Sequence, residues 1–297
     1  LARWFGLVVG VIASCPVVDA DTLLAGTATV DLTPPKRVPL AGYSRRGGEL
    51  ATGVHDPLSV RALILRDGTT SVAIVSCDLL IIDEAMFQAI EDRVRVELAS
   101  PPPTLLIAAT HTHSGPGAYG RKFLEKMSMG HFDEKVFEFL VARIVQAITT
   151  AATRMQPATI RVASVPSEGL VANRLVDGGV VDDELSVLVA DDQQGRPMAV
   201  AVNFAAHPTT LGAWNRQLSA DYPGVLTKTI ETQHPSAVCL FMAGAVGDQA
   251  PVKQAPPPKS LVGGQGSGFE SAERLGPALA AAMQPLIEER ARVPFQL

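Results

Sequence analysis

Two histidines lie one residue apart near the middle of the 297-residue chain, in the segment AATHTHSGPG (108–117). The apolar run 104–108 that leads into them predicts a short buried strand. Successive strand side chains point to opposite faces, so a strand that continued this far would place His111 and His113 on the same face. The Gly-Pro-Gly sequence that follows predicts a turn. Two imidazoles side by side at a strand end suit either a metal ion or proton transfer.

Three further apolar runs end in reactive side chains in the same way. VAIVSCD reaches Asp78, VAVNFAAHP reaches His207, and CLFMAGAVGDQAP contains Asp248. Zinc sites combine imidazole nitrogen with sulfur or oxygen ligands, and a catalytic site keeps one position for water. His111 and His207 are therefore the candidate metal ligands, while His113 or Asp248 would orient a ligand or move a proton.

Each of these residues also has a structural interpretation. A single histidine after an apolar run is more often a hydrogen-bonded structural residue, and GDQAP (247–251) is compatible with a simple turn. Arg174 would bind a carboxylate or polarise a carbonyl, although an exposed arginine is the commoner case. No role is expected for His131 and His234, which flank helices, or for His55, which would cap a turn.

The pattern of apolar residues predicts strands that alternate with helices. The strands are expected at 61–66, 71–77, 104–109, 159–164, 185–190, 198–204 and 237–243. Apolar side chains spaced by four residues predict helices over 83–98 and 133–153, and two more are expected over 222–233 and 270–290. Such alternation predicts an α/β fold with a layered mixed β-sheet core and flanking helices. No internal sequence repeat is visible.

Composition and charge narrow the class of protein. A content of 47% hydrophobic and 19% charged residues is globular. A net charge of −5, with no run of Lys and Arg longer than two, argues against nucleic-acid binding. Cys77 and Cys239 lie in apolar runs without a CxxC pair, so buried free thiols are expected. Serine-hydrolase and nucleotide-binding functions lack their usual motifs here.

The N-terminal segment 1–20, LARWFGLVVGVIASCPVVDA, resembles a secretory signal, because its apolar stretch is too short to cross a bilayer. Cleavage after Ala20 would leave one domain over 21–297. The sequence IASC also resembles a lipoprotein signal in which Cys15 is lipidated. The alternative is a buried N-terminal strand. We expect export, to the periplasm or medium, or as a lipoprotein anchored at Cys15.

Taken together, nine segments resemble the N-terminal catalytic domain of the neutral, non-lysosomal ceramidases. THTHSGPG is the most specific of them, and all nine follow the family's order over about 25–252. They are AGTATVDLTPP, LAGYSRR, GVHDPLSVRALIL, VAIVSCDLL, THTHSGPG, NR (173–174), NFAAHPTTLG, SADYPG and AGAVGDQAP.

The resemblance implies a zinc amidohydrolase that cleaves the amide of N-acylsphingosine or a related N-acyl lipid, with peripheral membrane contact. His111 and His207 match the two zinc-binding histidines of the family, and His113, Arg174 and Asp248 match residues around the metal. In the implied mechanism zinc lowers the pKa of a bound water and polarises the amide carbonyl, and His113 carries a proton to the leaving amine. A lipid substrate also predicts an exposed apolar rim near the site. With only 5% aromatic residues, the sequence does not show where such a rim would lie.

Two departures from the family pattern bear on activity. The family carries serine in Gly-Asp-x-Ser-Pro, where this chain has Ala250 in GDQAP. The family also completes its zinc site with a glutamate and a tyrosine well downstream, and Glu270 and Glu273 match neither. The missing ligands predict that the ceramidase-like domain over 21–297 is C-terminally incomplete, as an N-terminal fragment or a shortened relative with an incomplete metal site. Ala250 leaves a non-catalytic, ceramidase-like binding protein as the alternative to a hydrolase. A third interpretation, which rests on Cys15, is a surface lipoprotein with a structural role.

Overall fold

The computed structural model describes residues 23–98, 101–252 and 268–288, so the predicted signal segment and Cys15 lie outside the described residues. The helices are α1 (Glu84–Glu97), α2 (Phe123–Met129), α3 (Glu134–Ala152), α4 (Asp221–Gln233) and α5 (Phe269–Glu288), with a 3-10 turn at Ser44–Arg46. The strands are β1 (Leu24–Asp31), β2 (Gly53–Val54), β3 (Ser59–Asp67), β4 (Thr70–Cys77), β5 (Thr104–Ala109), β6 (Gln156–Pro166), β7 (Val171–Asn173), β8 (Glu184–Asp192), β9 (Pro197–Phe204), β10 (Gln217–Leu218), β11 (Val238–Ala243) and β12 (Gln249–Pro251).

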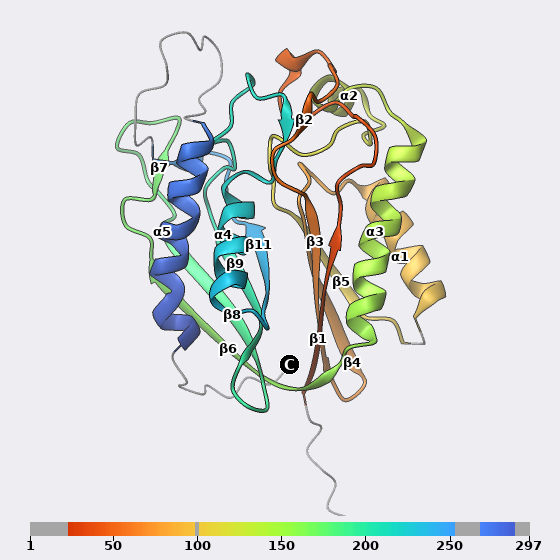
Figure 1. The fold of residues 1–297 in the computed structure, drawn as a ribbon, viewed down its shortest axis with the longest axis vertical. Coiled ribbons are helices and arrows are strands. Elements are labelled where there is room, and N and C mark those ends of the chain that lie inside the picture. Colours follow the sequence, from red (N-terminus) through yellow and green to blue (C-terminus); the bar gives the residue numbers. More distant parts are fainter. Residues whose placement is uncertain (1–22, 99–100, 253–267, 289–297) are drawn as a thin grey trace, which may run out of the picture.

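The eight long strands form one hydrogen-bonded array that folds over on itself. Its order is β11-β9-β8-β6-β1-β3-β4-β5. The central pair, β1 and β6, is joined by only two residue pairs, Leu24 with Pro157 and Ala25 with Gln156. The two halves of the array therefore face each other, with α1 and α3 outside one half and α4 and α5 outside the other (Figure 1). The result is a four-layer α/β/β/α sandwich, which confirms the predicted fold class.

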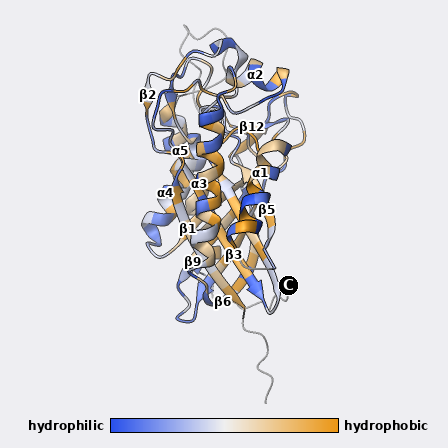
Figure 2. Cartoon of the chain, turned by 90° about the vertical axis from the view of Figure 1, so that its right-hand side faces the viewer, coloured by the Kyte–Doolittle hydropathy of each residue, from blue (hydrophilic) through white to orange (hydrophobic). Residues whose placement is uncertain are grey.

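Alternation along β3 shows why its sequence is a continuous apolar run. Ala62 and Ile64 belong to the core beneath α1 and α3, whereas Leu63 and Leu65 belong to the core between the two sheet halves. Successive side chains point to opposite faces, and both faces are buried, so the run Ala62–Leu65 is apolar throughout, whereas the buried Arg61 before it is ion-paired with Asp78. Figure 2 shows the hydrophobic residues along these central strands and the hydrophilic ones in the connecting loops.

The two halves of the sandwich share one topology. In the first half the order is β1, β3, β4, α1, β5, α3, and in the second it is β6, β8, β9, α4, β11, α5. Strands β4 and β5 are parallel, as are β9 and β11, whereas the remaining pairings in each half are antiparallel. This repetition of topology is not visible in the sequence. It gives each half one pair of parallel strands whose carboxyl ends carry the reactive segments.

All seven predicted strands and all four predicted helices are present, with ends that shift by a few residues. Residues 289–290 of the last predicted helix lie outside the described residues. The sequence did not predict β1 or α2, nor the short pairs β2–β10 and β7–β12. None of the described helices has the length and apolar character needed to span a membrane.

Leu63 tests the packing of the two sheet halves, because it is fully buried in the core between them. We expect Leu63→Ala to lower the free energy of unfolding by about 2–5 kcal/mol, the usual cost of a buried leucine truncation. Val96→Ala on α1, where the side chain is 86% exposed, should change it by less than about 0.5 kcal/mol. Urea unfolding measures both, and equal effects would contradict the two-sheet packing.

Candidate metal centre

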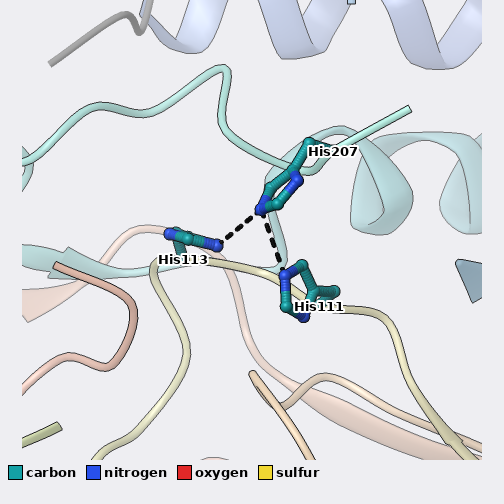
Figure 3. A group of neighbouring side chains, drawn as sticks. All are labelled: His111, His113 and His207. Atoms are coloured by element: carbon teal, nitrogen blue, oxygen red, sulfur yellow. Dashed lines mark hydrogen bonds between the residues drawn. The ribbon is translucent and has the colours of Figure 1, made fainter. Parts of the chain in front are cut away.

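Three imidazoles converge at one end of the sandwich. His111 Nε2 lies 3.1 Å from His207 Nε2, and His113 Nε2 lies 2.9 Å from the same atom. Figure 3 shows the three rings turned toward a common point. Their ligand atoms all lie within 4.8 Å of one another, so the set can hold a metal ion. The structure therefore brings the candidate ligands His111 and His207 together, with His113 beside them.

The two histidines of THTH are oriented by the backbone that follows β5. The predicted strand over 104–109 is confirmed as β5, which ends at Ala109, so His111 and His113 lie beyond it. The His111 backbone has a left-handed φ of 65°, a conformation that costs a non-glycine residue about 1–2 kcal/mol. Its N–H donates to Leu79 O at 3.0 Å, so the chain after β5 is tied to the chain after β4. Because the strand does not continue this far, strand alternation does not apply to His111 and His113, and this backbone turn orients the rings.

His207 enters from the opposite half of the sandwich, three residues after β9. Its backbone N–H donates to Gln249 O at 3.1 Å, and its ring Nδ1 lies 2.9 Å from Val246 O. Both partners belong to the segment after β11. Parallel strands end side by side, so the ends of β9 and β11 together fix this ring.

Hydrogen bonds assign the same tautomer to two of the rings. His111 Nδ1 lies 2.8 Å from Leu80 O, and His207 Nδ1 lies 2.9 Å from Val246 O. A carbonyl only accepts, so each Nδ1 carries the proton and each Nε2 presents a lone pair. Burial lowers the pKa of His111, and it lowers that of His207 to about 4, so both rings are neutral at pH 7.

Two lone pairs that face each other repel unless a cation lies between them. Two nitrogen ligands of one tetrahedral zinc ion, at about 2.0–2.1 Å each, lie about 3.3 Å apart, close to the 3.1 Å observed between His111 and His207. Metal-bound histidines also usually donate their other N–H to a backbone carbonyl or a carboxylate. The donor set of His111 and His207 therefore fits zinc.

His113 differs from its two neighbours. Its Nδ1 is buried and has no hydrogen-bond partner among the described residues. Burial and the neighbouring His207 and His111 lower its pKa to about 2, so this ring is neutral as well. It lacks the carbonyl anchor of a typical metal ligand and is held by packing: the Tyr43 ring lies 4.9 Å away, centroid to centroid.

The segment LAGYSRR supplies the support for His113, a role that the sequence did not reveal. A Cβ on Gly42, whose φ is 102°, would lie 2.6 Å from His113 Cγ. The Tyr43 hydroxyl donates to Leu211 O, and the buried Arg46 guanidinium donates to Ala41 O at 2.7 Å and to His113 O at 2.5 Å. The available signal was a glycine, an aromatic residue and an arginine within five positions, in a segment that matches the family pattern.

The cluster forms the floor of an open pocket of about 400 Å³. Leu80 and Ile81, from the segment after β4, line one part of it. Leu124, Glu125 and Ser128 of α2 line another, together with Arg174. The pocket is therefore largely apolar beside a polar floor, a lining typical of a small-molecule site.

Arg174 and Asp248 lie together next to the cluster. The guanidinium of Arg174 lines the pocket, and its Nε and Nη2 donate to Gly247 O at 3.0 and 2.6 Å. The Asp248 carboxylate accepts hydrogen bonds from Asn173 Nδ2 at 2.9 Å and from Gln249 Nε2 at 2.8 Å. These bonds lower the pKa of Asp248. The structure thus places Arg174 at the pocket and gives Asp248 contacts that hold the β7–β12 segments together.

Asp78, the remaining strand-end residue, is a structural acid. Its side chain is buried and accepts a hydrogen bond from Ser59 N. It also forms an ion pair with the buried Arg61, which in turn contacts Glu231. Burial raises the pKa of Asp78 against the effect of Arg61. Ala250 lies in β12, where it pairs with Ala172 of β7.

The residues for which no role was expected lie outside the cluster. His131 is exposed, and His234 ends α4 with its Nε2 3.4 Å from Gln284 Oε1. The His55 ring stacks on Phe269, with centroids 3.7 Å apart. Glu270 and Glu273 are exposed on α5, and the predicted buried free thiols, Cys77 and Cys239, are confirmed.

A family model described as the N-terminal region of neutral/alkaline non-lysosomal ceramidases matches residues 23–259. The chain belongs to this family. The neutral ceramidase of Pseudomonas aeruginosa is 29% identical over 208 residues, which covers 63% of this chain and 30% of the relative. Neutral ceramidase A of Dictyostelium discoideum is 27% identical over 227 residues, covering 69% of this chain and 31% of the relative. These sequence matches therefore cover less than a third of each relative.

A solved structure agrees on the fold. The crystal structure of the Pseudomonas aeruginosa neutral ceramidase matches with a TM-score of 0.80 at 24% identity, over 91% of this chain and 46% of that one. A structure described as ceramidase complexed with C2 matches with a TM-score of 0.78 at 23% identity. The four-layer sandwich is therefore a fold shared with a ceramidase.

Gly42 tests the support of His113 in this ceramidase-family chain. Gly42→Ala would place a methyl group against the imidazole and also strain a positive φ. The matched control is Gly47→Ala, whose φ is 61° but whose Cβ would meet nothing within 4 Å. We expect the control to cost about 1 kcal/mol of stability and Gly42→Ala to cost about 2 kcal/mol more, with displaced His113 ring signals in NMR. Equal costs and unchanged ring signals would contradict this contact.

Proposed function

We propose that the chain is a zinc-dependent hydrolase of the ceramidase type, which cleaves the amide bond of N-acylsphingosine or a related N-acyl substrate. The observation that supports this most is the convergence of three neutral imidazoles in a family member, at the floor of a largely apolar pocket. The relatives that share the family are ceramidases, and a ceramidase with bound C2 shares the fold.

In this proposal His111 and His207 hold the ion through Nε2, and the carbonyls of Leu80 and Val246 fix their orientation. When bound, zinc supplies a Lewis acid that activates water at neutral pH and polarises an amide carbonyl. The chain would contribute the rest: two fixed rings, Leu80 and Ile81 beside which an acyl chain would lie, and polar lining residues for the polar end of the substrate.

His113 and Arg174 have separate roles in the proposal. His113 Nε2 faces the reaction centre. Because the ring is neutral, we assign it the transfer of a proton from the attacking water to the leaving amine. Arg174 uses two of its five N–H donors on Gly247 O, which leaves donors for a substrate oxygen. Asp248 acts indirectly, because Arg174 N donates to Asp248 O at 2.7 Å and keeps the arginine beside the pocket.

Ala250 favours a second candidate, a non-catalytic ceramidase-like binding protein. Alanine offers no hydroxyl to bind the substrate or attack it, whereas the family has serine there. The retained set of His111, His113, His207 and Arg174 around one pocket favours the hydrolase. The N-terminal composition supports a further proposal that the chain is exported, as a secreted protein or as a lipoprotein anchored at Cys15.

Metal content distinguishes a metal centre from a structural histidine cluster. We expect about one zinc per chain in the purified protein, and none in the double variant His111→Ala, His207→Ala, because both fixed Nε2 ligands are lost. The double variant His131→Ala, His234→Ala removes two histidines outside the cluster and should keep the zinc. Elemental analysis measures all three proteins. A folded parent without zinc, or zinc loss in the control as well, would reject the assignment.

Turnover distinguishes the hydrolase from the binding protein. We expect zinc-loaded chain to release fatty acid from a short-chain N-acylsphingosine, measured by chromatography. His113→Gln should lower kcat by about 10²–10⁴-fold, the usual contribution of a general acid, with little change in KM and with zinc retained. Binding of this substrate without product would support the non-catalytic alternative. Loss of zinc in His113→Gln would make His113 a ligand instead.

A further inference from the structure

Two polar side chains of α2 line the pocket and have no role in the proposed reaction. They are Glu125 and Ser128, which line it together with Leu124. Residues three apart on a helix lie on the same face. Among the described residues that line this pocket, Glu125 is the one carboxylate and Arg174 the one guanidinium. The α2 wall therefore differs in chemistry from the wall that carries Arg174.

The hydrogen bonds on this wall leave acceptors at the pocket. The Glu125 carboxylate accepts the Lys122 N–H at 2.7 Å, its one hydrogen bond within the described part of the chain. A carboxylate has about four lone-pair positions, so most of its capacity is unused. The Ser128 hydroxyl donates its proton to Glu125 O at 3.0 Å, which leaves the lone pairs of its oxygen. Both side chains can thus accept a hydrogen bond from a bound molecule.

The backbone holds this wall in place. Ser128 O accepts the Gly42 N–H at 2.9 Å, and Met129 O accepts the Ala118 N–H at 2.7 Å. Met129 is buried, and Gly42 belongs to the segment that supports His113. The acceptors on α2 are therefore fixed relative to the histidine cluster.

The neighbouring charges do not satisfy Glu125. Lys122 and Lys126 are exposed on either side of it, and neither side chain lines the pocket or forms an ion pair with Glu125 among the described residues. Arg121 pairs with Glu134 at 3.2 Å instead. No acid of the described segment after β7 lines the pocket either. A molecule that enters the pocket therefore meets Glu125 as an acceptor without a charged partner.

The two walls together define what an N-acyl substrate must offer. Arg174 presents donors, which suit the carbonyl oxygen of an amide. Glu125 and Ser128 present acceptors, which require a donor on the substrate. A hydroxyl or an ammonium on the amine part supplies that donor, whereas an alkyl group would cover Glu125 without replacing its water. A polar group that loses water without gaining a partner weakens binding.

We propose that Glu125, assisted by Ser128, is a specificity-determining residue for the amine part of the substrate. It selects N-acyl amines that carry a hydrogen-bond donor, a hydroxyl or an ammonium, on that part. The inference rests on the proposed function for the reaction, but the selection itself is a property of binding. It therefore operates in the protein without metal as well as during turnover.

Binding of matched ligands to the metal-free full chain tests the selection. N-octanoylethanolamine carries the hydroxyl, and N-octanoylpropylamine has a methyl group in its place. NMR signals of the Leu80 and Ile81 methyl groups, which line the pocket, report binding. We expect the hydroxyl ligand to bind about tenfold or more tightly than the methyl ligand, the usual effect of a hydrogen bond to a charged group. N-octanoylethylenediamine tests the ammonium in the same way.

Glu125→Gln is the decisive variant because it preserves the fold of α2. The glutamine oxygen can still accept the Lys122 N–H, so the amide nitrogen, a donor, faces the pocket in place of a carboxylate oxygen. The preference for the hydroxyl ligand should fall to less than about twofold, and Ser128→Ala should reduce it by about two- to tenfold. The control, Glu97→Gln, makes the same charge change at an exposed position of α1 and should keep the parent's preference.

The outcomes separate this inference from the proposed function. A preference for either donor ligand that Glu125→Gln abolishes supports the inference, even where zinc-loaded chain cleaves neither ligand and the hydrolase is rejected. Where the ligands are cleaved, the preference should appear in KM rather than in kcat, because Glu125 binds a part of the substrate that does not react. A parent that binds all three ligands equally, or a preference that survives Glu125→Gln, would overturn the inference and leave the hydrolase intact.

Discussion

The approach of His111 Nε2 to His207 Nε2 is the constraint on which the rest of the site depends. Both rings are neutral and both present lone pairs at 3.1 Å, an arrangement that isolated imidazoles would not adopt. Backbone carbonyls hold each ring from behind, and those carbonyls belong to segments fixed by the sheet. The fold therefore holds the two lone pairs close together despite their repulsion, and a cation bound between the rings would remove that repulsion. Such preorganisation is how a scaffold gives a site its affinity for metal.

The repeated topology explains how rings from distant positions meet. Each half of the sandwich contributes one pair of parallel strands, β4 with β5 and β9 with β11, and the halves face each other across a shared core. The segments that follow these four strands therefore meet at one end of the molecule. His111 is tied to the segment after β4, and His207 to the segment after β11. Each ligand is held by a strand neighbour rather than by its own strand, so both halves must be folded before the cluster exists.

Much of this arrangement could be predicted from sequence. The features that could not be predicted depend on contacts between residues that are distant in the sequence. Apolar runs located the strands because burial on two faces leaves few polar positions, and strand-end histidines located the cluster. The left-handed backbone of His111 could not be predicted, because it depends on contacts with Leu79 and Leu80, which are distant in the sequence. Asp78 has the same pattern as the ligands, yet it pairs with Arg61 in the core. Whether a strand-end acid has a structural or a chemical role depends on the residues that it contacts. Those residues are distant in the sequence, so a local pattern does not reveal them.

Helix α2 links the chemistry of the pocket to the surface around it. It was missed in the sequence because seven residues make only two turns, too few to establish a helical period. Its apolar residues also lack a core to explain them: Met129 alone is buried, while its neighbours stay in solvent. A short helix that keeps apolar residues exposed loses the burial that normally stabilises helices of this length. Burial therefore does not explain the apolar residues of α2, which lines the pocket on one side and is exposed to solvent on the other. Access to the histidines and contact with the surroundings are thus properties of the same element.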